Sequence, residues 1–175
     1  MRNISKPKTT DYAAYAHIYI DLVPDDGNVL DHLDKNANLT AIFLRSLPEA
    51  KLTFRYAQNK WTIKEILGHL IDDERIYVYR ALRFARNDVT ELPGFDQDHF
   101  ARYSSSNNRT LDDLLEEFTL VRKSTLAFFA TLDDEALVRS GVGDGNRATV
   151  SALAYHIAGH ELRHLNIIRE RYLNS

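Results

Sequence analysis

The sequence predicts an all-α protein and, within that class, a four-helix bundle. Three observations lead to this prediction. Only four prolines interrupt the 175 residues, so long stretches are free to form helices. In four of these stretches apolar residues recur at spacings of three and four, the period of a helix with one buried face. Alternation typical of strands is absent over any useful length, and long amphipathic helices in one domain indicate a bundle.

The expected helices follow one another along the chain, and two of them open with recognisable caps. Their predicted ranges are residues 28–47, 62–86, 110–130 and 149–172. Thr62 is followed three residues later by Glu65, which is the pattern of a capping box. Thr110 precedes two aspartates, whose negative charge suits the N-terminus of a helix.

The connecting segments differ in length. We expect a single domain over residues 1–175, with residues 1–27 as an N-terminal arm packed on the bundle. The arm carries tyrosines at helical spacing, namely Tyr12, Tyr15 and Tyr19. Residues 87–109 form the longest connection, and a loop of this length is unusual unless it crosses the fold or shapes a site. The loops 48–61 and 131–148 are shorter and rich in turn-forming residues.

The composition excludes several classes of protein. Lys and Arg number 22 against 25 Asp and Glu, and this acidic balance disfavours nucleic-acid binding. The absence of cysteine excludes disulfides, thiolate metal sites and a cysteine nucleophile. No apolar run has the length of a membrane span, and the first residues lack the apolar segment of a signal peptide. We therefore expect a cytoplasmic protein with a small-molecule substrate and without a nucleic-acid or membrane partner.

Three of the seven histidines lie where the predicted helices should be buried. His160 and His164 are one turn apart on the fourth helix, an arrangement that places two imidazoles side by side for one metal ion. His69 lies at the edge of the apolar face of the second helix. Gly68 and Gly159 precede two of these histidines, and a glycine within a helix costs about 1 kcal/mol relative to alanine. Close helix approach, or room for a metal-bound ligand, would offset this cost. The pattern predicts one divalent ion held by the three histidines.

The three histidines can share an ion only if the second and fourth helices are antiparallel. His69 lies about two turns from the start of its helix, and His164 lies about two turns from the end of its own. In antiparallel helices both would lie about 10–12 Å from the same end of the bundle. A crossover over residues 87–109, which makes the second and third helices parallel, would supply this arrangement.

The remaining histidines lack this context. We expect His17, His32 and His99 to be structural or to lie on the surface. His156 continues the four-residue spacing of the fourth helix, but its angle takes it away from the apolar stripe, and its role stays open. On that helix we expect His164 inside the buried face, His160 at its flank and His156 furthest out.

Two glutamates near the centres of apolar faces raise a question of role. A buried carboxylate at Glu74 or Glu161 is costly unless it is paired or hydrogen-bonded. Glu161, next to His160, is the candidate catalytic residue as a general base, and either glutamate could instead orient a metal ligand. The alternative is a buried ion pair with an arginine such as Arg80 or Arg163, and the sequence leaves these alternatives open.

Four residues are candidates for the substrate pocket: Asp73, Glu74, Asp98 and Tyr103. The last two belong to the crossover, where Phe95 and Asp96 could also line the mouth of the site. From the helix pattern alone, Asp72 and Asp73 are expected to be solvated or to pair with helix neighbours.

Residues 160–164 read His-Glu-Leu-Arg-His, which matches the H-E-x-x-H pattern of zinc proteases. Those enzymes take a further ligand downstream, and no histidine follows His164. The third ligand must therefore come from upstream, which argues against a zinc protease.

The sequence resembles the DinB-like superfamily, also called YfiT-like metalloenzymes. The resemblance covers nearly the whole chain and rests on YAQNKWTIKEILGHLIDDERIYVYRALRFARND, LPGFDQDHF and SALAYHIAGHELRHLNIIRERYL. It implies a bundle of up-down-down-up connectivity with a three-histidine site at His69, His160 and His164. The ion implied is divalent, usually nickel or zinc. Relatives of this kind include thiol-dependent S-transferases and a maleylpyruvate isomerase, and many have no established substrate.

A three-imidazole site leaves a coordination position open, which is typical of catalytic rather than structural metals. An ion so held lowers the pKa of bound water to about 7 and would bind a thiol cosubstrate as the thiolate. Because the chain has no cysteine, any low-molecular-weight thiol must come from solution. We therefore expect a divalent-metal-dependent enzyme, by resemblance a thiol S-transferase or a hydrolase. The alternative is a non-catalytic metal- or small-ligand-binding bundle with a sensor or assembly role, and a homodimer is a further expectation left open.

Overall fold

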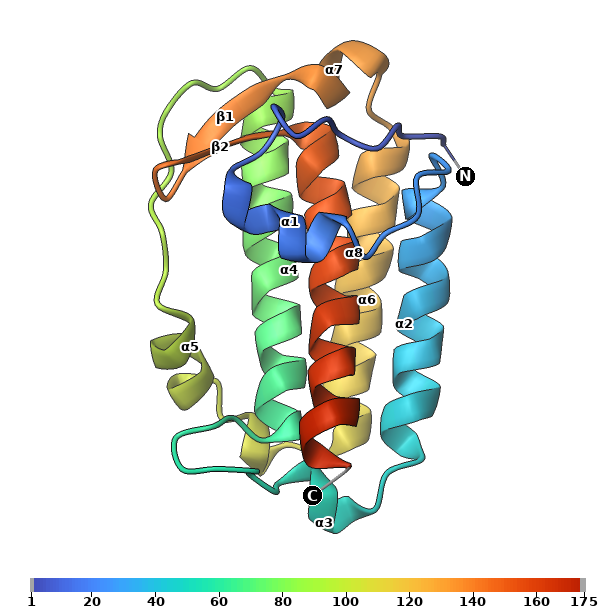
Figure 1. Cartoon of the computed structure of the whole chain (residues 1–175), viewed down its shortest axis with the longest axis vertical. Helices are drawn as coiled ribbons and strands as arrows, with labels where there is room; N and C mark the ends of the chain where they lie inside the picture. The colour runs from blue at the N-terminus through green and yellow to red at the C-terminus, as the bar shows by residue number, and fades with distance from the viewer. Residues whose placement is uncertain (1, 174–175) are drawn as a thin grey trace.

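Four long helices dominate the computed structural model, which describes residues 2–173 (Figure 1). They are α2 (Val29–Arg45), α4 (Ile63–Ala85), α6 (Leu111–Ala130) and α8 (Val150–Ile167), and α8 continues into a π-helical turn, Ile168–Tyr172. These helices correspond to the four that the apolar spacing predicts. The predicted all-α four-helix bundle is thus confirmed.

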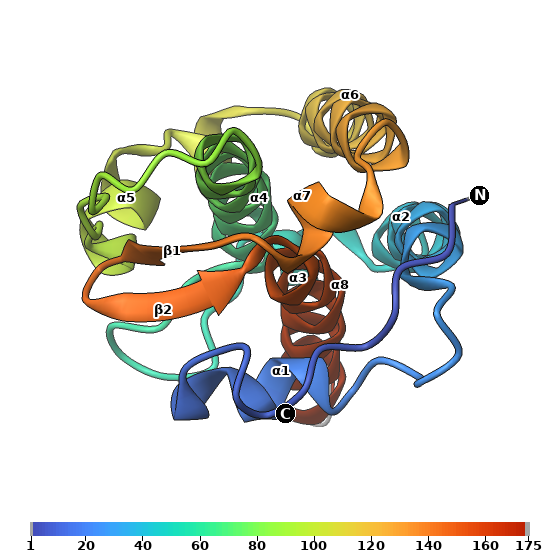
Figure 2. The same cartoon turned by 90° about the horizontal axis from the view of Figure 1, so that it is seen from above.

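Two of the long helices run down the bundle and two run up, so that α4 and α6 are parallel neighbours and α2 and α8 are parallel neighbours. In Figure 1, α2 and α8 run from the upper end to the lower end, whereas α4 and α6 run upward. Figure 2 shows the four helices at the corners of a square, and α4 contacts both α6 and α8. The pair α4 and α8 is therefore antiparallel, which is the arrangement that three histidines on one ion require.

Threonine caps fix where three of the long helices begin. Thr62 accepts a hydrogen bond from the backbone N–H of Glu65, and the Glu65 carboxylate accepts one from the backbone N–H of Thr62 at 2.8 Å. Thr110 and Thr149 cap α6 and α8 with a single bond each. The capping box that the sequence indicates is present, and such caps are typically worth about 1 kcal/mol each.

The crossover between α4 and α6 is partly helical. It contains α5 (Gln97–Tyr103) and a 3-10 turn, Ser106–Asn108, and it descends along the outside of α4 (Figure 1). Asp96 caps α5 by accepting hydrogen bonds from two backbone N–H groups. Gly68 lies under the crossover, because a Cβ there would come 2.2 Å from the hydroxyl oxygen of Ser106. The glycine in α4 therefore allows the close approach of another segment.

The upper end of the bundle carries a hairpin that the sequence analysis does not predict. Its strands are β1 (Ser140–Gly143) and β2 (Asn146–Thr149), preceded by the short helix α7 (Asp134–Val138). Four residues per strand are too few to display alternation. The turn residues Asp144 and Gly145 both have positive φ, as a two-residue hairpin turn requires, so this dipeptide was the available signal. Another short helix, α3 (Glu49–Leu52), lies between α2 and α4.

The N-terminal arm packs against α8. It forms a 3-10 turn, Ala14–Ala16, and the short helix α1 (His17–Ile20), which lies across α8 in Figures 1 and 2. A Cβ at Gly159 would come 2.0 Å from the backbone carbonyl oxygen of Tyr19. Gly159, like Gly68, is thus explained by close approach of the chain.

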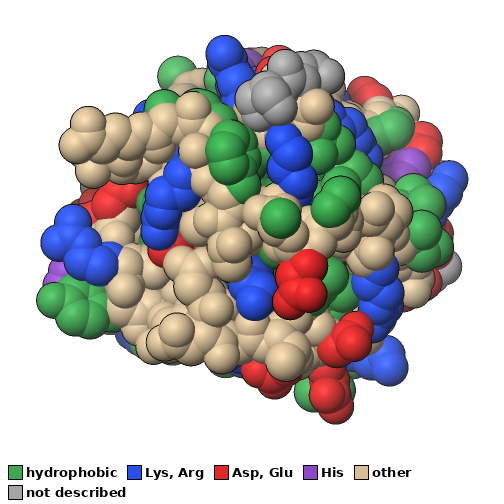
Figure 3. All heavy atoms as spheres, turned by 90° about the horizontal axis from the view of Figure 1, so that it is seen from below, with side chains coloured by type: hydrophobic (Ala, Val, Ile, Leu, Met, Phe, Trp, Pro, Cys, Tyr) green, Lys and Arg blue, Asp and Glu red, His purple; other side chains and the backbone are tan. Residues whose placement is uncertain are grey.

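The interior divides into two apolar clusters along the bundle. The upper cluster includes Phe84, Phe129 and Leu153, and the lower includes Leu67 and Phe118. The surface carries both signs of charge, as the lower end of the bundle illustrates in Figure 3. Within the described residues, every helix falls short of the combined length and apolarity needed to cross a membrane.

Candidate metal centre

Three histidines from two helices meet inside the bundle. The Nε2 atom of His160 lies 3.1 Å from the Nε2 atom of His69 on α4 and 3.1 Å from that of His164 on α8. All three nitrogens lie within 4.8 Å of one another. Because α4 and α8 are antiparallel, the turn of α4 that carries His69 lies at the same height in the bundle as the turn of α8 that carries His160 and His164.

The three nitrogens suit a divalent ion. Ligand nitrogens about 2.0–2.1 Å from a tetrahedral zinc ion would be separated by about 3.4 Å, close to the spacing seen here. Hydrogen bonding alone does not explain the cluster, because a neutral imidazole nitrogen has either one proton or one lone pair. His160 Nε2 can therefore satisfy only one of its two neighbours, whereas an ion would satisfy all three.

Asp73 lies behind His160. Its Oδ2 atom is 3.3 Å from His160 Nδ1, and the side chain is buried. A carboxylate at this position would hold the proton on Nδ1 and would leave the Nε2 lone pair free to bind a metal ion. The expectation that Asp73 is solvated is wrong, because α1 and α8 cover this side of α4. Asp72 is only partly buried and lies 3.9 Å from the guanidinium of Arg75, a pair along the helix as expected.

Burial keeps the histidines neutral, which is the form that binds metals. Loss of hydration lowers the pKa of His69 to about 3, and burial with the neighbouring Arg163 lowers the pKa of His164 to about 4. The pKa of His160 is lowered well below its usual value by burial and by the other histidines. Burial raises the pKa of the Asp73 carboxyl to about 8, against the opposing effect of Arg80, and a positive charge at the cluster would lower it again.

His156 is more buried than the helix angle predicts. It is 4% exposed, whereas His164 is partly buried, so the expected order of burial along α8 is wrong. The reason is the N-terminal arm, which gives α8 a second covered face. His156 stacks on Tyr77 with ring centres 3.9 Å apart and contacts Tyr19 edge to face. Its Nε2 lies 3.9 Å from Oδ2 of Asp73, and it is not one of the three histidines whose nitrogens converge.

Glu161 faces away from the three histidines, into the bundle core. Its carboxylate accepts hydrogen bonds from Thr40 at 2.5 Å and from Arg122 at 2.9 Å. Arg122 also donates two bonds of 2.9 Å to Glu74. Both glutamates therefore form buried ion pairs, but with Arg122 on α6 rather than with Arg80 or Arg163. The carboxylates of both glutamates are thus engaged in the core, and neither side chain lines the two open cavities beside the histidines.

Arg122 is the main residue that sequence reasoning missed. Burial tends to lower the pKa of its guanidinium, but Glu161 and Glu74 raise it, so Arg122 stays charged. The signal was available, because Arg122 occupies an apolar-stripe position between Phe118 and Thr125. A charged residue at such a position implies a buried acidic partner.

Two cavities border the histidine cluster. The upper cavity has a volume of about 500 Å³ and is lined by Asp73, His160 and the hairpin, and the lower cavity has about 290 Å³ and is lined by His164. Gln97 and Asp98 of α5 line both. Trp61, which was not among the predicted site residues, also lies here: its Nε1 donates a 3.0 Å hydrogen bond to Asp98, and its ring centre lies 4.7 Å from that of His69.

The other residues discussed from the sequence lie either at the upper cavity or at the surface. Phe95 and Asp96 line the upper cavity, as expected of the crossover. Tyr103 is 69% exposed and lines neither cavity, because α5 turns its ring outward against His99. His17 and His32 lie near aspartates at the surface, at 3.7 and 2.9 Å.

The fold and this cluster define a helical-bundle protein with a candidate three-histidine metal centre. Residues 32–168 match the model of the DinB superfamily, and this match spans most of the chain. The protein belongs to the DinB superfamily, which confirms the resemblance seen in the sequence.

The chain is also similar to two individual proteins. A protein of Oceanobacillus iheyensis, named as a candidate metal-dependent hydrolase, is 23% identical over 148 residues, which cover 83% of this chain and 84% of that protein. The solved structure of YfiT from Bacillus subtilis, described as a probable metal-dependent hydrolase with an unusual four-helix bundle topology, matches with a TM-score of 0.63 and 17% identity. It covers 94% of this chain and 91% of YfiT, a likeness that shows the fold.

Proposed function

We propose that this protein is a metal-dependent enzyme that acts on a small molecule, by hydrolysis or by transfer of a thiol. The observation that carries the proposal is the convergence of three neutral imidazole nitrogens beside an open cavity. His69, His160 and His164 would hold one divalent ion, with nickel or zinc as the proposed metals. Such an ion would act as a Lewis acid and would lower the pKa of a nucleophile beside it.

The protein side chains would prepare this centre. Asp73 would fix the orientation of His160, because its carboxylate lies at the nitrogen that faces away from the cluster. The ring of Tyr19 lies 5.2 Å from that of His160, and Trp61 lies against His69 on the other side. These aromatic walls would exclude water from two sides of the cluster and leave the cavities as the routes of entry.

The two cavities support a reaction with two reactants. A hydrolase needs one organic substrate and water, and the names of the two relatives favour this reaction. A thiol transferase needs a thiol and an electrophile, and the two cavities, which share Gln97 and Asp98 of α5 in their walls, would give each reactant its own approach. Both reactions use the same centre, so one set of assays tests them together.

The experiment begins with the metal content of the protein purified without added metal. We expect about one divalent ion per chain, and His164→Ala should lose it while the surface variant His99→Ala keeps it. The metal-loaded protein is then tested with ester, amide and lactone substrates and with low-molecular-weight thiols paired with electrophiles. Turnover that disappears in His164→Ala supports the proposal. Wild-type metal content in His164→Ala contradicts it, and bound metal without turnover in any assay favours the non-catalytic bundle.

A further inference from the structure

The wall of the upper cavity contains a buried positive charge that lacks an ion-pair partner. Arg80 lies on α4 and is 6% exposed. Its Nε is buried without a hydrogen-bond partner, and its Nη2 donates a long bond of 3.3 Å to the carbonyl oxygen of Pro93. The guanidinium lies 5.1 Å from the centre of the Tyr77 ring. Among the described residues, no carboxylate forms an ion pair with it.

Arg122 provides the contrast within the same protein. It is buried to a similar degree, but its guanidinium donates hydrogen bonds to both carboxylate oxygens of Glu74, to one of Glu161 and to the carbonyl oxygen of Leu33. A charge removed from water without such partners is unfavourable for the fold. Arg80 therefore has unused capacity to bind an acceptor that the chain does not supply.

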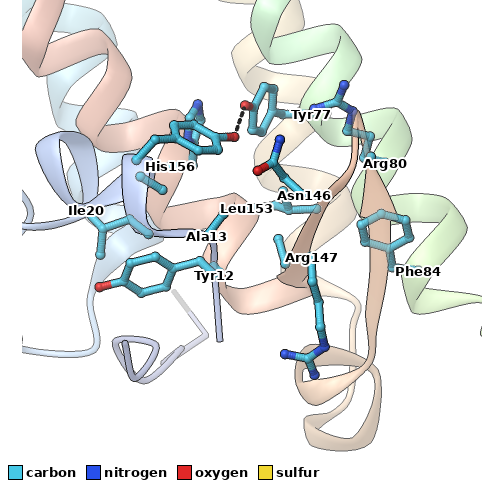
Figure 4. Close-up of a pocket in the computed structure, with 15 residues that line it drawn as sticks. Tyr12, Ala13, Ile20, Tyr77, Arg80, Phe84, Asn146, Arg147, Leu153 and His156 are labelled. Atoms are coloured by element: carbon cyan, nitrogen blue, oxygen red, sulfur yellow. Dashed lines mark hydrogen bonds between the residues drawn. The ribbon is translucent and has the colours of Figure 1, made fainter. Parts of the chain in front are cut away.

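Arg80 faces the cavity that borders the cluster. Asp73, Tyr77 and Arg80 recur at spacings of four and three residues, which places them on one face of α4. Arg80, Tyr77 and Asn146 line the upper cavity and also a smaller cavity next to it, and the close-up of the smaller cavity in Figure 4 shows Arg80 beside Tyr77, with Asn146 of the hairpin near them. A Cβ at Gly143 would come 2.9 Å from Arg80 Nε, so a larger residue in β1 would crowd the guanidinium.

None of the other charged groups that line the upper cavity forms an ion pair with Arg80. Asp73 interacts electrostatically with Arg80, but its carboxylate lies 3.3 Å from Nδ1 of His160 and makes no direct contact with the guanidinium. Asp96, Asp98 and Asp144 line the mouth of the cavity and are exposed to water, which screens their charge. Within the described lining, Arg80 is the only buried cationic side chain.

We propose that Arg80 binds the carboxylate end of the substrate, which makes the substrate class a small carboxylic acid. This inference rests on the proposed function, because the reacting group would lie at the histidine cluster. A carboxylate presents two oxygens to the fork of a guanidinium and carries a single charge that one arginine balances. A phosphate dianion would leave one negative charge uncompensated in a buried wall.

The positions along α4 set the length of the substrate. Arg80 follows His69 by about three helical turns, or roughly 16 Å along the axis. The arginine side chain leans back toward the start of the helix, over Tyr77. The carboxylate and the reacting group would then be about 10 Å apart, which corresponds to a chain of about seven or eight bonds.

The test compares a carboxylate probe with a neutral probe of the same shape. Hexanoate and hexanamide are titrated into the metal-loaded protein, and binding is followed by calorimetry. Hexanoate should bind to the wild-type protein more tightly than hexanamide does. Arg80→Gln should weaken the binding of hexanoate by about 10- to 100-fold and leave the binding of hexanamide unchanged. Arg80→Lys should retain part of the preference. Arg147→Gln is the matched control, because Arg147 is an exposed arginine of the hairpin that lies next to Arg80, and its loss should change neither affinity.

Two outcomes would overturn the inference. Hexanoate affinity that is unchanged in Arg80→Gln would show that the metal or another residue binds the anion. A melting temperature that falls in Arg80→Met as much as in Arg122→Met would show a structural role, whereas loss of an unpaired buried charge should leave it unchanged or raise it. Failure of the proposed function looks different, because turnover would be absent while the Arg80-dependent preference for hexanoate remained.

Discussion

Arg122 and Glu161 form a fully buried ion pair of 2.9 Å at mid-height in the bundle. Glu161 follows His160 directly in α8, so this pair sets the position of α8 against α6 within one residue of a candidate metal ligand. The bidentate contact of Arg122 with Glu74 does the same for α4. The two helices that carry the histidines are therefore tied to a common arginine on a third helix.

The first prediction concerns the loss of this arginine. Arg122→Met leaves two buried carboxylates without a counter-charge, and removal of one partner from a buried pair costs about 3–5 kcal/mol. We expect a loss of this size in the free energy of unfolding, measured by urea denaturation. Arg163→Met, on the exposed side of α8, should stay within about 0.5 kcal/mol of the wild type. A similar effect for both variants would show that the buried network contributes little.

Glu161→Gln separates a structural role from a catalytic one. The amide keeps the shape of the side chain and can still accept from Thr40 or Arg122, while Glu74 still balances the arginine. We expect a loss of stability of about 1–2 kcal/mol with metal content and turnover retained. Thermal melts and metal analysis of the same preparation check this. An unchanged melt combined with a fall in activity of about 10²–10⁴-fold would restore the general-base hypothesis.

Asp73→Asn tests the support of the candidate ligand His160. The amide can no longer stabilise the Nδ1 proton by charge, and loss of such a partner typically costs about 10–100-fold in metal affinity. A chelator competition with the loaded protein measures this change, and the helical circular dichroism should remain. Asp72→Asn is the control, since Asp72 is its partly buried neighbour. Equal affinity in both variants would remove Asp73 from the centre.

Acid should destabilise the metal-free protein. The pKa of His69 and of His156 is lowered to about 3, and that of His164 to about 4, each chiefly by burial. The unfolded chain therefore binds more protons below about pH 6.5, so stability is lost as the pH falls from there toward 4, by up to about 1.4 kcal/mol per pH unit for each group.

The raised pKa of Asp73, about 8, acts in the opposite direction. Its folded form takes up a proton as the pH falls below 8, which stabilises the fold before the histidines begin to titrate. We expect a stability maximum between about pH 6.5 and 7, measured by thermal melts in the presence of chelator. A flat profile from pH 7 to pH 5 would contradict the neutral, buried state of the histidines.

The sequence predicted the four long helices and the level at which the histidines meet, because both depend on local periodicity. It could not predict the partner of Glu161, since Arg122 lies 39 residues away in the chain and the choice among arginines depends on packing. The burial of Asp73 and His156 depends on the N-terminal arm, which crosses α8. Gly159, where the arm comes closest, is the local indication of this crossing in the sequence. The hairpin was not predicted because each of its strands has four residues, which is only two periods of strand alternation.

The contact between the backbone of Tyr19 and Gly159 has a consequence for how this family can diversify. The family match begins at residue 32 and so does not include the arm, although the arm forms a wall beside His156 and His160. Substitutions in this segment can reshape one side of the entrance while the helices and the three imidazoles stay in place. One wall of the upper cavity and the three imidazoles thus come from separate stretches of the chain, and a change in the first need not move the second.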